Sequence, residues 1–586
     1  MGRANVRYIR IILGPFRLAG NNKDEVSRKG NPGARRHRNP ASPGIIRTPM
    51  QGTMMHYPLT LIHVLERAGK YFPRAEIVSR RPDRSLHRYT YADLYRRARA
   101  LAEALQAAGL KRGERVATLM WNHHAHLEAY FGIPIAGGVF HTLNLRLAPS
   151  EIAYIANHAS DRFLIVDDIL LPLYEKIRDS VRFERVIVVR WNPASAAGEL
   201  EDYEGFLATA AGNFRYPDLD ENEAASMCYT SGTTGAPKGV VYTHRSVVLH
   251  SFLLTTVDNF AICNADSVLP AVSMFHVNGW SLPFSSTLVG AKQVLPGPHL
   301  DPESLLDLCQ QERVTVAAGV PTVWLSVVDA LDQHPARWKL TPMRILVGGA
   351  APPLALVRKL HQHGMSLEQG WGLTESSPQA TTSQLKAHMK DWPAEERHQI
   401  KAQAGLPVPF VERRVVNQDG EVPWDGATMG EVQLRGVWVA SSYYNLPAES
   451  DKWTEDGWLR TGDVGTVDAE GYLKIVDRTK DLIKSGGEWI SSVDLENALV
   501  AHPDVREAAV IAVPHPKWQE RPIAVLTLRD GVQLQPDQLR EFLSVRFAKW
   551  QLPDAFVFME KLPHTSTGKL LKAELRRRFQ DWKWEG

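Results

Sequence analysis

The segment Tyr229-Thr-Ser-Gly-Thr-Thr-Gly-Ala-Pro-Lys-Gly239 decides the fold of this 586-residue chain. It places hydroxyl side chains, glycines and one lysine between two strand-like runs. Glycines let backbone N–H groups turn toward an anion, hydroxyls add neutral donors, and a lysine adds charge. A Walker A loop is excluded, because Pro237 precedes Lys238 and Gly239 follows it. The segment therefore predicts a polyphosphate-binding loop, although its composition alone also fits a surface loop.

Strand-like and helical segments alternate on both sides of this loop. Strands are predicted at 115–120, 163–166, 186–190 and 344–350, and Asn122 is expected to cap the helix after the first of them. The alternation favours an α/β architecture with largely parallel sheets covered by helices. After residue 478 the pattern changes, and Ser491 to Asp494 has the spacing of a capping box. A small α+β unit of about a hundred residues is predicted there.

Composition and charge exclude several classes of protein. Hydrophobic residues make up 44% and charged residues 23% of the chain, which is typical of a globular protein. No uninterrupted apolar run reaches the length of about 18 residues that a membrane-spanning helix needs. The three cysteines are scattered, which argues against a disulfide framework and a thiolate zinc site.

Residues 1–53 differ from the rest, since they carry eleven basic and only two acidic residues. The remainder is mildly acidic, so a nucleic-acid surface on the main body is not supported. We predict a disordered N-terminal extension or an over-extended gene start, with Met50, Met54 and Met55 as alternative starts. Residues 6–18 also fit a transit peptide, and a nucleic-acid or membrane arm is a third alternative. We expect a cytoplasmic protein, or a mitochondrial-matrix one if the segment is a transit peptide.

The glycine- and threonine-rich segment resembles the phosphate-binding loop of the acyl-adenylate-forming superfamily, which includes acyl-CoA synthetases, peptide-synthetase adenylation domains and beetle luciferases. Four further segments follow in that family's order: Gln369-Gly-Trp-Gly-Leu-Thr-Glu375, Thr461-Gly-Asp463, Asp477-Arg-Thr-Lys-Asp-Leu-Ile-Lys484 and Pro563-His-Thr-Ser-Thr-Gly-Lys569. The resemblance covers roughly residues 55–580. It implies a large N-terminal domain of layered α/β subdomains at 54–478 and a small mobile α+β lid domain at 479–586.

The resemblance implies a role for each motif in binding ATP. The loop residues that would hold the β and γ phosphates are Thr230, Ser231, Gly232, Thr233, Thr234, Gly235 and Lys238. Residues expected along the nucleotide are Gly349, Ala350, Ala351, Gln369, Gly370, Trp371 and Gly372. Asp463 would accept two ribose hydroxyls, as a carboxylate can, and Arg478 would contact the same ribose.

Three catalytic roles also follow from the resemblance. Thr374 would donate to the α-phosphate, Glu375 would bind Mg²⁺ together with Thr234, and Lys569 would bridge the substrate carboxylate and the α-phosphate. Considered alone, a Thr-Glu pair is typical of a helix cap and Lys569 of a solvated lysine, so these roles depend on the family pattern.

Formation of a thioester requires a second arrangement of the same parts. The family rotates its C-terminal domain about a hinge, which Lys480 matches here. The rotation would bring in a segment whose glycines let the pantetheine arm of coenzyme A pass closely: Lys484, Gly486, Gly487 and Glu488.

The acyl pocket is expected around Phe275, Trp280, Val320 and Trp324, and the resemblance places His276, a further candidate catalytic residue, at the mouth of this pocket. His276 considered alone is typical of a packed or capping histidine. No acid that could hold a substrate ammonium stands in these segments, which favours an uncharged acyl chain. The segments look most like those of medium-chain fatty acid and 3-methylmercaptopropionate CoA ligases. Trp371 stands where that family commonly has tyrosine, and its indole is expected to shorten the pocket or to stack on adenine.

The predicted function is ATP-dependent activation of a short- to medium-chain fatty acid to acyl-AMP, followed by transfer to coenzyme A. Alternatives are a 3-methylmercaptopropionate–CoA ligase, an enzyme that loads a carrier protein, and a silent nucleotide- or lipid-binding relative. The expected cofactors and partners are ATP, Mg²⁺, coenzyme A and a small carboxylic acid, without nucleic acid or a membrane span. A homodimer is left open.

Overall fold

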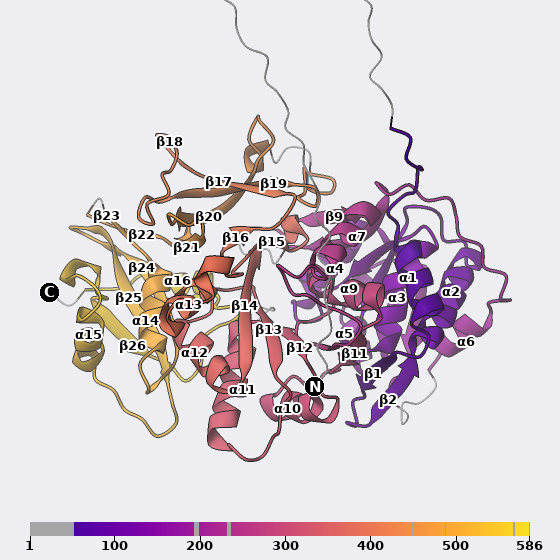
Figure 1. The fold of residues 1–586 in the computed structure, drawn as a ribbon, viewed down its shortest axis with the longest axis horizontal. Helices are drawn as coiled ribbons and strands as arrows, with labels where there is room; N and C mark the ends of the chain where they lie inside the picture. The colour runs from indigo at the N-terminus through magenta and orange to yellow at the C-terminus, as the bar shows by residue number, and fades with distance from the viewer. Residues whose placement is uncertain are drawn as a thin grey trace, which may run out of the picture. The chain divides into compact units, whose positions relative to one another are not determined.

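The computed structural model describes residues 52–192, 198–230, 236–446, 450–486, 488–565 and 569–584. The chain divides into two units, Met1–His56 and Tyr57–Gly586. All helices and strands described below belong to the second unit (Figure 1). The predictions for the basic segment 1–53 fall almost entirely outside the described residues. None of the described helices combines the length and the apolar character needed to cross a bilayer.

Two mostly parallel sheets form the large domain. The first has the spatial order β16 (Leu406–Pro407), β15 (Gln379–Thr382), β14 (Met365–Gly372), β13 (Met343–Val347), β12 (Val316–Gly319), β10 (Ser267–Pro270), β11 (Lys292–Leu295), β1 (Glu76–Arg80) and β2 (Leu86–Thr90). The second has the order β7 (Glu201–Asp202), β6 (Arg185–Val189), β5 (Asp161–Asp167), β3 (Arg115–Leu119), β4 (Val139–Thr142), β8 (Ala224–Tyr229) and β9 (Gly239–Thr243). Antiparallel pairs occur only at the outer strands of each sheet among the described pairs. The predicted α/β class is confirmed.

Helices cover these sheets, as buried parallel strands require. Their bounds are α1 (Leu61–Tyr71), α2 (Tyr91–Ala107), α3 (His124–Ile135), α4 (Pro149–Ala159), α5 (Leu171–Glu175), α6 (Tyr203–Ala208), α7 (His244–Leu253), α8 (Val277–Trp280), α9 (Leu282–Val289), α10 (Pro302–Gln311), α11 (Pro321–Gln333), α12 (Leu354–Gln362) and α13 (Ala394–Lys401). Helix α3 is apolar around most of its circumference and lies in a core shared by strands of both sheets.

The expected cap at Asn122 is wrong. Helix α3 begins at His124, with His123 in the N-cap position. The Asn122 side chain instead donates to the carbonyl oxygens of Pro270 and Val272, at 3.1 and 2.7 Å, and accepts from the backbone N–H of Met274. Asn122 therefore fixes the loop that leads from β10 toward Phe275.

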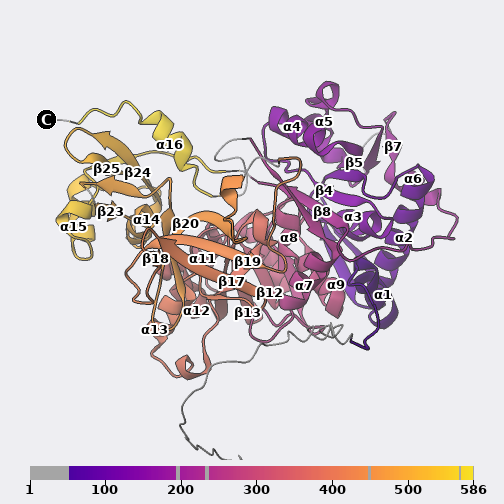
Figure 2. The ribbon, with the colours of Figure 1, turned by 90° about the horizontal axis from the view of Figure 1, so that it is seen from above.

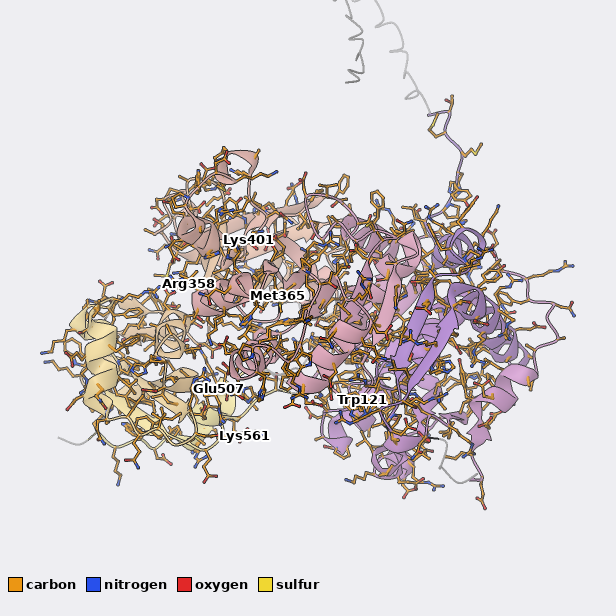
Figure 3. The ribbon with its side chains drawn as sticks, turned by 60° about the horizontal axis from the view of Figure 1, so that its bottom comes forward. Trp121, Arg358, Met365, Lys401, Glu507 and Lys561 are labelled. Carbon is orange, nitrogen blue, oxygen red and sulfur yellow. The ribbon has the colours of Figure 1, made fainter. Side chains whose placement is uncertain are left out.

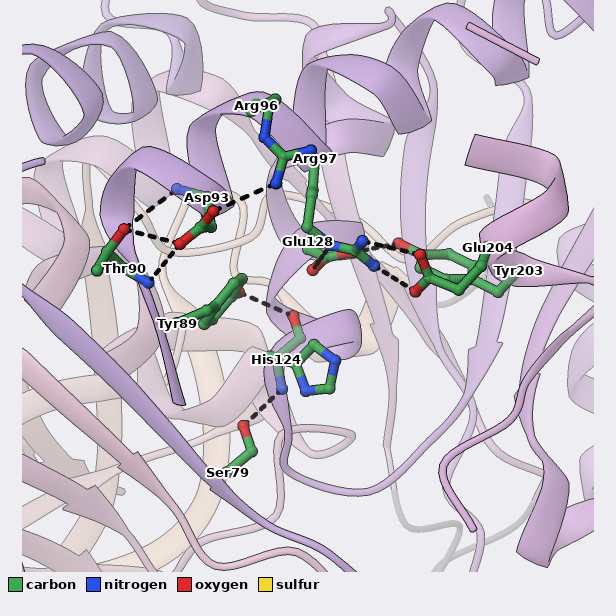
Figure 4. Close-up of polar contacts among 10 residues, drawn as sticks. All are labelled: Ser79, Tyr89, Thr90, Asp93, Arg96, Arg97, His124, Glu128, Tyr203 and Glu204. Carbon is green, nitrogen blue, oxygen red and sulfur yellow. Dashed lines mark hydrogen bonds and ion pairs between the residues drawn. The ribbon is translucent and has the colours of Figure 1, made fainter. Parts of the chain in front are cut away.

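A buried ion pair joins α2 to α3. The Arg97 Nε lies 2.7 Å from the Glu128 carboxylate, which is fully buried and also accepts from the Tyr203 hydroxyl at 2.8 Å (Figure 4). The carboxylate of Glu204 accepts hydrogen bonds from both terminal nitrogens of Arg97. These contacts pack α2, α3 and α6 together on one side of the second sheet.

An antiparallel sheet and a small domain complete the unit. The antiparallel sheet has the order β18 (Gly420–Glu421), β17 (Val411–Asn417), β19 (Gly430–Gly436), β20 (Leu459–Val467) and β21 (Leu473–Arg478). The small domain has the strand order β23 (Glu488–Ile490), β22 (Ile483–Ser485), β25 (Gln519–Leu528) and β24 (Val505–His515), with β26 (Ala555–Phe558) beside β25, and the helices α14 (Ser492–Val500), α15 (Pro536–Ser544) and α16 (Lys572–Arg578). Figures 1 and 2 both show these small-domain elements gathered together in gold and yellow.

The start of α14 confirms the predicted capping position. The Ser491 hydroxyl accepts from the backbone N–H of Asp494 at 3.0 Å. It also donates to the carbonyl oxygen of Val476 at 2.7 Å, so the cap contacts the last strand of the antiparallel sheet. The predicted domain boundary near residue 478 falls at the end of β21 and stays a prediction.

Candidate active site

A cavity of about 600 Å³ lies where β8, β12, β13 and β14 end. Neighbouring strands of the first sheet run parallel, so the segments that follow them meet at one sheet edge. Predicted residues that line this cavity are Thr230, Lys238, Phe275, His276, Trp280, Val320, Gly349, Gly370, Trp371, Gly372, Thr374, Glu375, Arg478, Lys480 and Lys569. The structure thus brings together groups that are up to 339 positions apart in the sequence, as Thr230 and Lys569 are.

A second cavity of about 310 Å³ adjoins the first. Among the described residues, it contains the predicted nucleotide contacts that the first cavity lacks, namely Ala350, Ala351, Gln369 and Asp463. Gly349, Trp371 and Lys569 line both cavities. Gly349 has φ +82°, a left-handed conformation that favours glycine, and the turn it makes opens the space beyond β13.

Two hydrogen bonds between Thr230 and Lys238 close the base of the phosphate-binding loop. The Thr230 N–H donates to the carbonyl oxygen of Lys238 at 2.9 Å, and the Lys238 N–H donates to the Thr230 hydroxyl at 3.1 Å. The middle of the loop, Ser231, Gly232, Thr233, Thr234 and Gly235, lies outside the described residues. The described ends therefore fix where the loop leaves β8 and enters β9.

Glu375 is held in a short turn at the cavity wall. Its side chain is almost fully buried and accepts from the hydroxyl of Tyr443, and its backbone oxygen accepts from the Ala440 N–H at 2.8 Å. The Tyr443 ring also lies under the Lys238 ammonium, 5.1 Å from its centroid. Sequence reasoning missed Tyr443, which links the lysine of the loop to Glu375.

The described residues contain no group of three or more His, Cys, Asp and Glu side chains that could hold a metal ion. Mg²⁺ in nucleotide sites commonly takes one or two carboxylates and completes its shell with phosphate oxygens and water. The single carboxylate of Glu375, which faces the cavity, fits that donor set. Thr234, the other predicted ligand, lies outside the described residues.

Asp463 and Arg478 are cross-strand partners. They face each other in the register of β20 and β21, and the Arg478 Nε lies 3.1 Å from Asp463 Oδ1. The Asp463 side chain is 5% exposed, whereas that of Arg478 is 40% exposed. A third residue joins them, since the indole N–H of Trp371 donates to Asp463 Oδ2 at 3.0 Å.

Lys569 reaches the cavity from the small domain. Its Cε lies 3.3 Å from the position that a Cβ on Gly349 would occupy. Burial and the nearby Arg478 guanidinium lower the pKa of Lys569 to about 8, although Asp463 and Glu375 act in the opposite direction. Behind it, His564 pairs with Glu507 of β24, labelled in Figure 3, with 3.2 Å between Nε2 and Oε1. The lysine loop is thus tied back to its own domain.

The segment labelled α8 is a left-handed turn and not a regular α-helix, and it forms one wall of the acyl side. The residues 277–281 all have positive φ, including Val277 at +36° and Trp280 at +54°. Left-handed turns cost roughly 1–2 kcal/mol per non-glycine residue, so this conformation needs support from its surroundings. Asn278 supplies part of it, since its backbone N–H contacts Cys228 Sγ at 3.3 Å and its amide contacts Thr142 Oγ1 at 3.4 Å.

Uncharged groups line the cavity beside Trp280. His250 and Gln379 lie there and were missed by sequence reasoning. The Gln379 backbone N–H donates to His250 Nε2 at 3.1 Å, so the ring proton is on Nδ1, which lies 2.9 Å from the Ser281 hydroxyl. Burial lowers the pKa of His250 to about 3, and burial with Lys569 lowers that of His276 to about 3. Both imidazoles are therefore neutral.

Several predicted residues do not line this cavity. Trp324 is 2% exposed and packs in the hydrophobic core between α10, α11 and α12, with its indole against Gly319. Lys484, Gly486 and Glu488 line neither cavity, and the Lys484 ammonium lies over the Trp489 ring at 5.5 Å. Gly487 lies outside the described residues.

Comparisons with known proteins match the chain over most of its length. It matches the models of the AMP-binding enzyme family over residues 65–444 and of the AMP-binding enzyme C-terminal domain over residues 494–569. A long-chain-fatty-acid–CoA ligase of Thermus thermophilus is 52% identical over 533 residues, which cover 90% of this chain and 97% of that protein. A 3-methylmercaptopropionyl-CoA ligase of Ruegeria pomeroyi is 43% identical over 537 residues, covering 91% and 99%.

A solved structure matches the fold. The crystal structure of the anthranilate CoA ligase AuaEII in complex with anthranoyl-AMP superposes with a TM-score of 0.79 at 25% identity, and the match covers 89% of this chain and 98% of that chain.

Proposed function

The chain belongs to the AMP-binding enzyme family, and we propose that it joins a fatty acid to coenzyme A through an acyl-adenylate. It is an AMP-forming acid–CoA ligase with a large N-terminal and a small C-terminal domain. One observation carries the proposal: Lys569 of the small domain lies in the same cavity as Lys238 and Glu375 of the large domain.

In the first step, a carboxylate oxygen of the acid attacks the α-phosphorus of ATP, and pyrophosphate leaves with the electrons of the broken P–O bond. Two anions must approach, so the site has to supply positive charge and oriented donors. In the proposal, Lys569 bridges the carboxylate and the α-phosphate, Thr374 donates to the α-phosphate, and Lys238 holds the outer phosphates. The position of all three on one cavity supports these roles.

In the second step, the sulfur of coenzyme A attacks the acyl carbon and loses its proton, and AMP leaves as the acyl C–O bond breaks. We propose that the small domain rotates at Lys480 for this step, which withdraws Lys569 and brings in Lys484, Gly486 and Glu488. The last three residues lie away from both cavities while Lys569 lies inside, which is the arrangement expected for the first step.

The acid is proposed to carry an uncharged chain. Near Trp280, His250 and Gln379 are neutral and the polar atoms of His250 are already bonded within the protein, while the Arg146 guanidinium, which also lines the cavity, lies over the Phe275 ring at 5.9 Å. Such a wall favours a hydrocarbon chain over an ammonium-bearing acid. We propose a fatty acid of short to medium length, with 3-methylmercaptopropionate as the alternative because a relative 43% identical to this chain is named for that acid.

Mg²⁺ is proposed as the metal, held by Glu375 with the phosphates of ATP. When bound, it would neutralise part of the phosphate charge. Whether the chain forms a homodimer is left open, and light scattering of the purified chain would decide it.

The test of the function is AMP release with Mg·ATP and straight-chain acids from about C3 to C16, plus 3-methylmercaptopropionate, with and without coenzyme A. AMP release that needs both acid and coenzyme A, with one optimum of chain length, is the expected result. Exchange of pyrophosphate without coenzyme A-dependent turnover would point to a carrier protein as acceptor. If no acid stimulates AMP release, the alternative that remains is a catalytically silent nucleotide- or lipid-binding relative.

A further inference from the structure

Trp371 stands between the two cavities. It lies near the end of β14, and its half-buried ring packs against two hydrophobic clusters, one around Leu434 and Trp438 and one around Val415 and Val432. It lines both cavities. The packing fixes the ring plane, so the direction of the indole N–H is fixed as well.

That N–H donates a hydrogen bond to the Asp463 carboxylate. The distance from Trp371 Nε1 to Asp463 Oδ2 is 3.0 Å, and the other carboxylate oxygen, Oδ1, pairs with Arg478 Nε at 3.1 Å. Each oxygen thus has one donor from a different strand, β14 or β21. A carboxylate can accept about four hydrogen bonds, so each oxygen still has capacity for one more donor.

Two donors on two sides also fix the rotation of the carboxylate. The Asp463 side chain is only 5% exposed, so water contributes little to its orientation. A hydrogen bond to a charged, buried group is among the stronger ones in proteins. Without the indole, the half-exposed Arg478 would be the only one of the described side chains to hold this carboxylate.

We infer that Trp371 is a positioning residue for the ribose of ATP: its indole N–H holds the Asp463 carboxylate so that both oxygens meet the 2′- and 3′-hydroxyls. The inference rests on the proposed function, because it takes ATP as the nucleotide. The indole N–H donates to Asp463. This hydrogen bond is not needed for either of the two other roles considered for the ring, which are to shorten the acyl pocket and to stack on adenine.

The test measures selectivity for the ribose. We compare KM and kcat for ATP, 2′-deoxy-ATP and 3′-deoxy-ATP in acid-dependent pyrophosphate exchange, for the parent and for Trp371→Phe. Loss of the N–H should raise KM for ATP by roughly tenfold with kcat nearly unchanged. KM for the two deoxy nucleotides should rise less, so the selectivity for ATP should shrink.

A matched control is Trp438→Phe. The indole N–H of Trp438 donates to the carbonyl oxygen of Gln379 at 3.0 Å, in the same hydrophobic cluster but without contact to Asp463. This variant should keep the parent's selectivity among the three nucleotides, whatever it does to the melting temperature. Asp463→Asn is the positive control, and it should lose selectivity at both hydroxyls.

A second variant keeps the test decisive if Trp371→Phe does not fold. Replacing Trp371 by 3-benzothienylalanine retains the ring's size and exchanges the N–H for sulfur. A reduced selectivity in this variant supports the inference, and unchanged KM values for all three nucleotides in either folded variant would overturn it. Absence of acid-dependent exchange in the parent would instead overturn the proposed function.

Discussion

Both terminal nitrogens of Arg529, in the small domain, donate hydrogen bonds to the carboxylate oxygens of Asp329 on α11, with N···O distances of 3.1 and 3.3 Å. The two residues are 200 positions apart, and their side chains are 39% and 26% exposed. This ion pair exists in the arrangement in which Lys569 lies in the cavity. A rotation of the small domain away from that arrangement would separate the two charges.

Arg529→Met should therefore weaken the first half-reaction more than the second. Partly exposed ion pairs contribute about 0.2–1 kcal/mol, so we expect a roughly two- to fivefold lower rate of pyrophosphate exchange. Thioester formation from preformed acyl-AMP should not fall. Arg178→Met, which removes a surface pair with Glu175 in the large domain, is the control and should change neither rate. Equal losses in both half-reactions of Arg529→Met would contradict this role.

The charge of Lys569 predicts a pH dependence. Its pKa is lowered to about 8 mainly by burial, and only the ammonium form can bridge two anions. The ammonium is present below this pKa and lost above it, so kcat/KM for the acid in pyrophosphate exchange should fall as the pH rises through about 8. In Lys569→Arg the guanidinium stays charged, and this fall should disappear from the profile up to about pH 10. The same fall in both proteins would assign it to another group.

Tyr443→Phe should raise the requirement for Mg²⁺. The variant removes the hydroxyl that donates to Glu375, so the carboxylate is less well oriented. We expect a roughly three- to tenfold higher Mg²⁺ concentration at half-maximal exchange, measured at a fixed, saturating ATP concentration. Tyr444→Phe is the matched control, because that ring packs beside His158 instead. An unchanged Mg²⁺ titration in Tyr443→Phe would show that the hydroxyl does not position Glu375.

Two neighbouring arginines on α2 should differ in their effect on stability. Arg97→Met leaves the buried Glu128 carboxylate without its guanidinium and should cost about 3–5 kcal/mol of the free energy of unfolding. Arg96→Met removes only an exposed pair with Asp93 and should cost about 0.5 kcal/mol or less (Figure 4). Urea denaturation followed by circular dichroism compares the two. Similar losses would mean that the buried pair does not hold α2 and α3 together.

The sequence predicts the parts of this site that local chemistry specifies. The strands predicted at 115–120, 163–166, 186–190 and 344–350 begin within two residues of the predicted positions, and Ser491 caps α14 as expected, because both features depend on residues a few positions apart. Tyr443 and Trp371 contact their carboxylates across 68 and 92 positions. No periodicity or turn signal records such contacts, because they arise only when segments far apart in the sequence meet in the fold.

The sequence around Trp324 contains a pattern that predicts a buried position for its side chain. Residues 324, 327, 328 and 331 follow the helical i, i+3, i+4, i+7 spacing, and all four are buried in one core. That spacing predicts a core-facing indole on α11, whereas the family pattern suggested a pocket wall. Local amphipathic spacing is the better guide at this position.

The most direct test of the account is to trap the intermediate. The protein is incubated with Mg·ATP and its preferred acid without coenzyme A, quenched, and analysed by mass spectrometry, before and after a chase with coenzyme A. Acyl-AMP that accumulates on the parent, converts to acyl-CoA in the chase, and is lost in Lys569→Ala is the predicted result. Acyl-CoA formed without any acyl-AMP, or acyl-AMP formed equally by Lys569→Ala, would contradict it.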